Sequence, residues 1–319
     1  MRKGRVEEEC ALAQRIDKEI TRHTKTQLST IQHVDSRAIW ECVRRLTGKK
    51  QQNNRVSGID AESLNDHYYK ISTDHSYAAP PLKQTVTNSD TDYIAEWQVF
   101  GILDKFRPTA TGLDGLPAWF LRLGALIFCR PLSRLFNFLL STSTVPHQWK
   151  QAWICPVPFS DHVQPANFRP ISITPVLTRI MERTVIQKFI YPNFQKPKAS
   201  LTFDDQFAFR PTGSTTAAII TLLHKVMHLL LTNPYVIVIT LDFSKAFDTV
   251  HHSTLLNKIA QLDVPDHVYN WLVDFFAGHM HQTKYGDQMS SLRPKSASIM
   301  QGSAIGPASY VVNASSYRW

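Results

Sequence analysis

The chain has 319 residues, of which 43% are hydrophobic and 19% are charged, a balance that is ordinary for a globular protein. Lysine and arginine number 35 against 26 aspartates and glutamates, which gives a formal net charge of +9. This excess of positive charge favours a polyanionic partner, with nucleic acid ahead of an anionic membrane surface.

The cysteines exclude two kinds of small stabilised domain. They are far apart and form no Cys-x-x-Cys pair, so neither a zinc knuckle nor a dense disulfide framework is indicated. The four are Cys10, Cys42, Cys129 and Cys155. The N-terminal sequence lacks the apolar segment of a secretory signal, and no run of about 18 apolar residues predicts a membrane helix. We therefore expect an intracellular protein, in the cytoplasm or the nucleus, of unknown oligomeric state.

Residues 1–90 are predicted to form a helical and linker region. Leu12, Ile16 and Ile20 recur at every fourth position among charged residues, which indicates a narrow amphipathic helix. Residues 76–92 (SYAAPPLKQTVTNSDTD) are rich in Pro, Ser and Thr, a composition typical of a loop. We place a domain boundary there.

Residues 91–235 combine helical periodicity with one short strand signal. An apolar stripe at positions i, i+3, i+4, i+7 and i+8 predicts a helix over residues 131–143. Its members are Leu132, Leu135, Phe136, Leu139 and Leu140. Ser214 precedes another long apolar run and is a plausible N-cap. Further helices are predicted at 91–106, 117–128, 174–190 and 213–231, and a strand at 147–159.

Residues 236–319 begin with the clearest strand signal of the chain. The run Val236–Ile239, within NPYVIVITLDF, is continuously β-branched and predicts a buried strand. Helical patterns follow at 251–262 and 267–278, and after them come one or two weak strand signals. The mixture predicts an α+β fold that is rich in helices.

Asp242 is a charged residue at the end of the predicted buried strand, and this position requires an explanation. A carboxylate at the end of a buried strand can present a metal ligand or a general base to a cleft, but it can equally open a turn. Asp248 stands before a helical run and is predicted to be an N-cap. His251 and His252 are adjacent and do not form an i, i+4 metal pair, so surface or packing roles are expected for them.

Five segments in a fixed order resemble the reverse transcriptase domain of non-LTR (LINE-type, jockey-like) retrotransposons. They are TGLDGLP (111–117), ANFRPISIT (166–174), DDQFAFRPTGSTTAA (204–218), VITLDFSKAFDTV (238–250) and MQGSAIGP (300–307). The resemblance implies a right-hand polymerase fold, with helix-rich fingers over 91–235, a partial palm over 236–319 and no thumb. It also implies an RNA template, a DNA primer and deoxynucleoside triphosphates as partners and substrates.

The resemblance assigns roles to individual residues. The aspartate that ends the strand binds two catalytic Mg²⁺ ions, with Mn²⁺ as a possible substitute, and it matches Asp242; the backbone carbonyl of Phe243 would also reach a metal. The aromatic residue under the nucleotide sugar, which excludes a 2′-hydroxyl, matches Phe247. The remaining matches are Arg169 for the triphosphate, Gln301 and Gly302 for the template and nascent base pair, and Arg210 for the template path.

Two departures from the family pattern predict reduced activity. The aromatic-Ala-Asp-Asp motif that completes the metal site is absent, and the adjacent pair Asp204 and Asp205 fits a different segment, so it is expected at the surface. Phe159 stands where the family has a triphosphate-binding lysine. We therefore expect a truncated domain without polymerase activity.

Two alternatives stay open. A non-catalytic RNA- or DNA-binding remnant would keep the basic side chains of the fingers, and an unstable product would leave the strand at 236–242 without neighbours, with its apolar edge exposed. The basic residues in question are Arg169, Arg179, Arg183, Lys188, Arg210 and Lys225.

Overall fold

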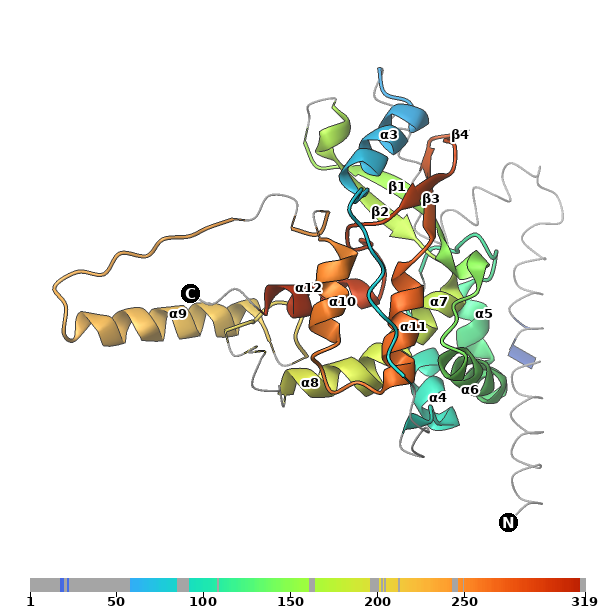
Figure 1. Cartoon of the computed structure of the whole chain (residues 1–319), viewed down its shortest axis with the longest axis horizontal. Helices are drawn as coiled ribbons and strands as arrows, with labels where there is room; N and C mark the ends of the chain where they lie inside the picture. Colours follow the sequence, from blue (N-terminus) through green and yellow to red (C-terminus); the bar gives the residue numbers. More distant parts are fainter. Residues whose placement is uncertain are drawn as a thin grey trace, which may run out of the picture. The chain divides into compact units, whose positions relative to one another are not determined.

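The structure is a computed structural model that describes most of the chain from residue 58 onward (Figure 1). The described residues are 18, 19, 22, 58–84, 92–107, 109–160, 164–195, 201, 203, 205–211, 213–242, 246–248 and 250–315. The chain divides into two compact units, Met1–Asn54 and Arg55–Trp319. All elements below belong to the second unit, and the predicted helix around Ile16 falls outside the described residues. The division at residue 90 and the boundary between fingers and palm at 235 stay predictions.

Five described strands form one sheet. They are β1 (Gln151–Pro158), β2 (Phe168–Ile173), β3 (His279–Tyr285), β4 (Gln288–Met289) and β5 (Arg293–Lys295). Strand β1 pairs antiparallel with β2 and parallel with β3, and β3 also pairs antiparallel with β4 and β5. The strand predicted at 147–159 is therefore confirmed as β1, and the weak signals near the C-terminal end correspond to β3, β4 and β5.

Helix α3 (Ala61–Ile71) packs on this sheet (Figure 1). Thr283 Oγ1 on β3 donates a hydrogen bond to Asn65 Oδ1 at 2.9 Å, and both residues are fully buried. Arg293 on β5 donates to Asp66 Oδ1 at 2.7 Å. Tyr68 is buried in the same small core, beside Phe168. Helix α3 thus covers the sheet, although it is far from β3 and β5 in the sequence.

The remaining helices surround a large apolar core. They are α4 (Glu96–Asp104), α5 (Ala118–Leu123), α6 (Ala125–Ser141), α7 (Val176–Val185), α8 (Tyr191–Gln195), α9 (Thr215–Leu230), α10 (His252–Ile259), α11 (Asp266–Phe276) and α12 (Ile305–Ala314). Three short helical segments, η2 (His147–Lys150), η3 (Pro165–Asn167) and η4 (Ile186–Ile190), complete the described elements. All of the α-helices named here except α9 contribute buried residues to this core. The mixed helix and strand composition confirms the predicted α+β class, while the assignment to fingers, palm and thumb stays a prediction.

Most predicted helices are present, with changed boundaries. Helix α6 begins at Ala125 and continues through Pro131, so the predicted break between 117–128 and 131–143 lies at Gly124 instead. Four members of the predicted stripe are buried and Leu135 is exposed. Ser214 caps α9 as predicted, because its side chain accepts a hydrogen bond from Ala217 N at 3.1 Å.

The predicted strand at 236–239 is wrong. Residues 235–242 are extended, but no described strand pairs with them. The apolar side chains of this segment face solvent: Ile237 is 76% exposed, Ile239 79% and Leu241 65%. No residue of the preceding helix α9 is buried either. A β-branched run forms a strand only when a neighbouring strand satisfies its backbone groups, and the described residues supply none here.

Candidate functional site

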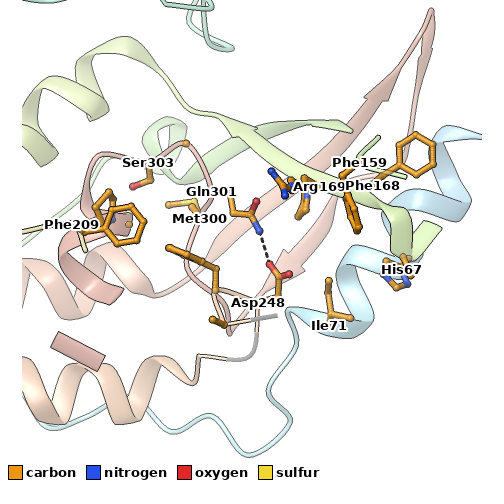
Figure 2. Close-up of a pocket in the computed structure, with 17 residues that line it drawn as sticks. His67, Ile71, Phe159, Phe168, Arg169, Phe209, Asp248, Met300, Gln301 and Ser303 are labelled. Atoms are coloured by element: carbon orange, nitrogen blue, oxygen red, sulfur yellow. Dashed lines mark hydrogen bonds between the residues drawn. The ribbon is translucent and has the colours of Figure 1, made fainter. Parts of the chain in front are cut away.

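A pocket of about 680 Å³ lies between the end of the sheet and the turn that precedes α12 (Figure 2). Its walls come from distant parts of the chain: α3, β2, the turn at 246–248 and the turn at 301–303. Four residues predicted from the resemblance line it: Arg169, Phe247, Gln301 and Gly302. Tertiary folding therefore brings four of the seven predicted site residues together. Asp242 and Arg210 do not line this pocket, and Phe243 is outside the described residues.

The turn at 301–303 is held against β2. Gly302 has φ +108°, and a Cβ on it would lie 2.5 Å from the carbonyl oxygen of Ser172, so glycine is required for this approach. Ser172 N donates a hydrogen bond to Gln301 O at 2.6 Å. The close backbone contact expected at Gly302 is thus made with β2.

Asp248 is part of the same turn contact. Gln301 Nε2 donates to Asp248 Oδ1 at 3.0 Å, and Figure 2 shows these two side chains facing each other. The prediction that Asp248 caps the next helix is wrong, because the residue before α10 is His251 and no side chain caps that helix. The carboxylate of Asp248 orients the amide of Gln301 instead.

A buried carboxylate supports this turn from the opposite side. Glu182 on α7 is fully buried, and its Oε2 accepts hydrogen bonds from Ser303 Oγ at 2.5 Å and from Ile305 N at 3.0 Å. Ile305 is the first residue of α12, and its N–H donates to Ser303 Oγ at 3.2 Å as well, so Glu182 and Ser303 together satisfy this backbone donor. Burial raises the pKa of Glu182 above its usual value.

Arg169 lies at the mouth of the pocket beside an aromatic ring. Its side chain is on the exposed part of β2, and the guanidinium carbon is 5.4 Å from the centre of the Phe159 ring. With phenylalanine at position 159, the pocket lacks the cation expected at that position. The Phe159 ring instead makes a cation–π contact with the guanidinium of Arg169. The pocket keeps one exposed guanidinium with a defined position.

Two aromatic residues, Phe209 and Phe247, line the pocket, and the ring of Tyr310 packs against both. Phe247 is half-buried, and its ring stacks on that of Tyr310 with centroids 5.1 Å apart and an interplanar angle of 18°. Phe209 packs its edge against both rings, with centroids 5.8 Å from Phe247 and 5.5 Å from Tyr310. We call Phe209, Phe247 and Tyr310 the aromatic wall below.

Two predicted site residues stand apart from the pocket, and a third falls outside the described residues. Asp242 is exposed at the end of the unpaired extended segment, and Phe243 is not among the described residues. The guanidinium of Arg210 donates to two backbone carbonyls, those of Phe203 and Phe194. These contacts give Arg210 a structural role in its loop, and its predicted template contact stays a prediction.

The described residues do not form a metal site. No group of three or more His, Cys, Asp or Glu side chains comes together among them in a way that could hold a metal ion. Asp242 is thus not part of any such group of three or more ligating side chains in the described part of the chain.

Most of the basic side chains considered for nucleic acid already have partners within the chain. Arg179 is buried and donates to Thr109 Oγ1 and Ala110 O, so it cannot reach a phosphate in this conformation. Lys188 donates to the Tyr93 carbonyl, and Lys225 pairs with Asp205 at 3.2 Å. The contact with Asp205 agrees with the surface position expected for that carboxylate.

The two adjacent histidines have the roles predicted for them. His251 is exposed and pairs with Asp74 at 2.7 Å, while His252 is buried and donates from Nε2 to Ser298 O at 2.8 Å. Burial lowers the pKa of His252 to about 4.

Across the described residues, no helix combines the length and apolar character that a membrane crossing requires.

Sequence reasoning missed His67 and Ile71, which line the pocket, and Glu182, which supports one of its turns. Glu182 sits on an apolar helix face, and its partner Ser303 is 121 positions away. His67 and Ile71 reach the pocket from α3, in the region predicted to precede the domain. A single acidic residue on a buried helix face was the one local signal that could have pointed to Glu182.

Comparisons with known proteins agree with the resemblance. Residues 158–315 match the family model described as reverse transcriptase (RNA-dependent DNA polymerase). The chain is similar to the RNA-directed DNA polymerase from mobile element jockey of Drosophila melanogaster, at 29% identity over 186 residues. It is also similar to the probable RNA-directed DNA polymerase from transposon BS of the same fly, at 27% identity over 183 residues. These matches cover 58% and 57% of this chain and 20% of each relative, so the chain spans about a fifth of the length of the curated relatives it matches.

Proposed function

Because residues 158–315 carry a reverse transcriptase domain of the kind found in non-LTR retrotransposons, we propose that the pocket binds an incoming deoxynucleotide in RNA-directed DNA synthesis. The observation that supports this most is the meeting of Arg169, Phe247, Gln301 and Gly302 in one pocket. They come from separate parts of the chain, and each has a chemistry that nucleotide binding requires.

Each residue has a distinct task in this proposal. The forked guanidinium of Arg169 donates to the triphosphate, and the Phe159 ring holds it in place. The ring of Phe247 lies under the sugar and leaves no room for a 2′-hydroxyl. Gln301 presents an oriented amide to the nascent base pair, and Gly302 allows the turn that carries this amide to lie close against β2.

Metal-dependent catalysis is not assigned to the described residues. Reverse transcriptases as a family use divalent metal ions, and Asp242 is the residue we propose as a ligand for Mg²⁺ or Mn²⁺. Since the described part of the chain holds no cluster of metal-ligating side chains, we assign no catalytic step to a metal ion.

Nucleotide affinity tests the proposed pocket. The chain is bound to an RNA template annealed to a DNA primer with a dideoxy end, and the Kd of the next matching nucleotide, dATP, is measured. Charged hydrogen bonds contribute about 1.5–3 kcal/mol, so Arg169→Ala should raise the Kd roughly tenfold or more. Arg130→Ala is the control, because Arg130 is an exposed arginine on α6 that does not line the pocket. An equal Kd in the two variants would contradict the proposal.

A second candidate is a nucleic-acid-binding remnant without catalysis. The exposed position of Asp242 and the lack of a metal cluster in the described part of the chain favour it. Primer extension on an RNA template with Mg²⁺ or Mn²⁺ separates the two. Synthesis of cDNA that disappears in Asp242→Ala supports the polymerase. Binding to the hybrid that weakens with salt but ignores Asp242→Ala, with no synthesis, supports the remnant.

A further inference from the structure

We propose that Phe209 and Tyr310 are specificity-determining residues that hold the Phe247 ring in position and so set how strongly the pocket prefers deoxyribose to ribose. The inference rests on the proposed function and extends it to two residues outside the predicted site. It is based on the ring contacts within the aromatic wall.

Phe247 needs support from other side chains to act with precision. It lies in a turn, in neither a helix nor a strand, and its described backbone contact is the hydrogen bond from Ile299 N to Phe247 O at 2.8 Å. A site that distinguishes one hydroxyl group has to hold its groups within about 0.5 Å. A half-buried ring on a turn reaches that precision only when its neighbours restrict it.

Tyr310 supplies the first restriction. It projects from α12, whose start is fixed by Glu182, and its ring lies almost parallel to that of Phe247. Translation of the Phe247 ring toward α12 is therefore blocked. The hydroxyl of Tyr310 is not needed for this contact, because the interaction is between ring faces.

Phe209 supplies the second restriction, and its backbone is strained to do so. It has φ +60°, a region that is unfavourable for a residue with a large side chain, and its ring is 46% exposed. Burial of the ring therefore does not account for this conformation. Strained residues of this kind concentrate at functional sites, and here the strain directs the ring against Phe247 and Tyr310.

The loop that carries Phe209 is anchored to the core. Arg210 donates to the carbonyls of Phe203 and Phe194, whose side chains are both buried. Gly213 closes the loop so tightly that a Cβ on it would lie 2.0 Å from the Phe207 carbonyl oxygen. Phe209 is thus a rigid contact for the Phe247 ring, in line with a role in positioning it.

The test compares two nucleotides that differ only at the 2′ position. The chain is bound to an RNA template annealed to a dideoxy-ended DNA primer with uracil as the next template base, and the Kd is measured for dATP and for ATP. An aromatic pair contributes about 0.5–1.5 kcal/mol, so the ratio of the Kd for ATP to the Kd for dATP should fall about two- to twelvefold in Tyr310→Ala and in Phe209→Gly. Tyr310→Phe keeps the ring and should keep the ratio. Phe138→Ala removes an exposed aromatic from α6 and should also leave the ratio unchanged.

The Phe209→Gly variant separates specificity from folding. Glycine suits a positive φ, so this variant should unfold at the same urea concentration as the wild-type chain, or a higher one, while it loses selectivity. If dATP binds the wild-type chain but both ring-removing variants keep the wild-type ratio, the inference is wrong and the proposed function stands. Loss of dATP affinity at an unchanged ratio would likewise show a merely structural role. A wild-type chain that binds neither nucleotide overturns the proposed function as well.

Discussion

Replacing Gly302 with alanine would place a methyl group 2.5 Å from the Ser172 carbonyl oxygen, in a backbone conformation with φ +108°. Two costs then add. A positive φ costs a residue with a Cβ about 1–2 kcal/mol, and relief of the clash separates the turn from β2 and breaks the bond from Ser172 N to Gln301 O, worth about 1 kcal/mol. We expect the free energy of unfolding to fall by about 3 kcal/mol.

The chain offers matched controls for the two costs. Gly115 also has a positive φ, +67°, but a Cβ there meets nothing within 4 Å, so Gly115→Ala should lose only about 1 kcal/mol. Gly101 lies in α4 with open space around it, and Gly101→Ala should gain about 0.5–1 kcal/mol. Urea unfolding followed by circular dichroism measures all three. If Gly302→Ala and Gly115→Ala lost equal stability, the contact with Ser172 would not govern the turn.

Two further predictions follow from burial. Burial lowers the pKa of His252 to about 4 and those of His279 and His281 to about 3, all below the usual 6.5. Below about pH 6.5 the unfolded chain therefore binds protons at these histidines that the folded chain does not bind. Urea unfolding should show the free energy of unfolding falling by about 1 kcal/mol per histidine between pH 6.5 and pH 5.5. His281→Leu should make this fall smaller by one histidine, and a flat profile would contradict the reasoning. The second prediction concerns the exposed segment 235–242: Ile237→Lys with Ile239→Lys should reduce self-association in light scattering and change stability by less than about 0.5 kcal/mol. A large loss of stability would mean that this segment is packed as a strand after all.

Helices were predictable from the sequence because their signal is local. The stripe in residues 131–143 places Leu132, Phe136, Leu139 and Leu140 on one face, and the structure buries all four. Ser214 could be named as a cap because its bond reaches only to Ala217. The boundary at Gly124 was not predictable in the same way, since Pro131 is tolerated inside α6.

The pocket was predictable in part. Motif resemblance named Arg169, Phe247, Gln301 and Gly302, and these four residues line one cavity. It did not name Glu182 or Tyr310, because neither their side-chain type nor their spacing marks a contact with the pocket residues. Arg179 illustrates the opposite error: an arginine in a basic segment was considered for nucleic acid, yet packing buries it against Thr109 and Ala110.

By itself, the sequence determined the family of the domain, the class of its fold, the positions of most helices and the residues of its most distinctive motifs. These depend on short-range periodicity and on residue identity, which a linear chain displays directly. Tertiary structure alone decided that Asp248 orients Gln301, that α3 covers the sheet and that the run Val236–Ile239 pairs with no strand in the described part of the chain. A strand is completed by backbone hydrogen bonds to a neighbour, and its own apolar pattern does not specify which neighbour, if any, will be there.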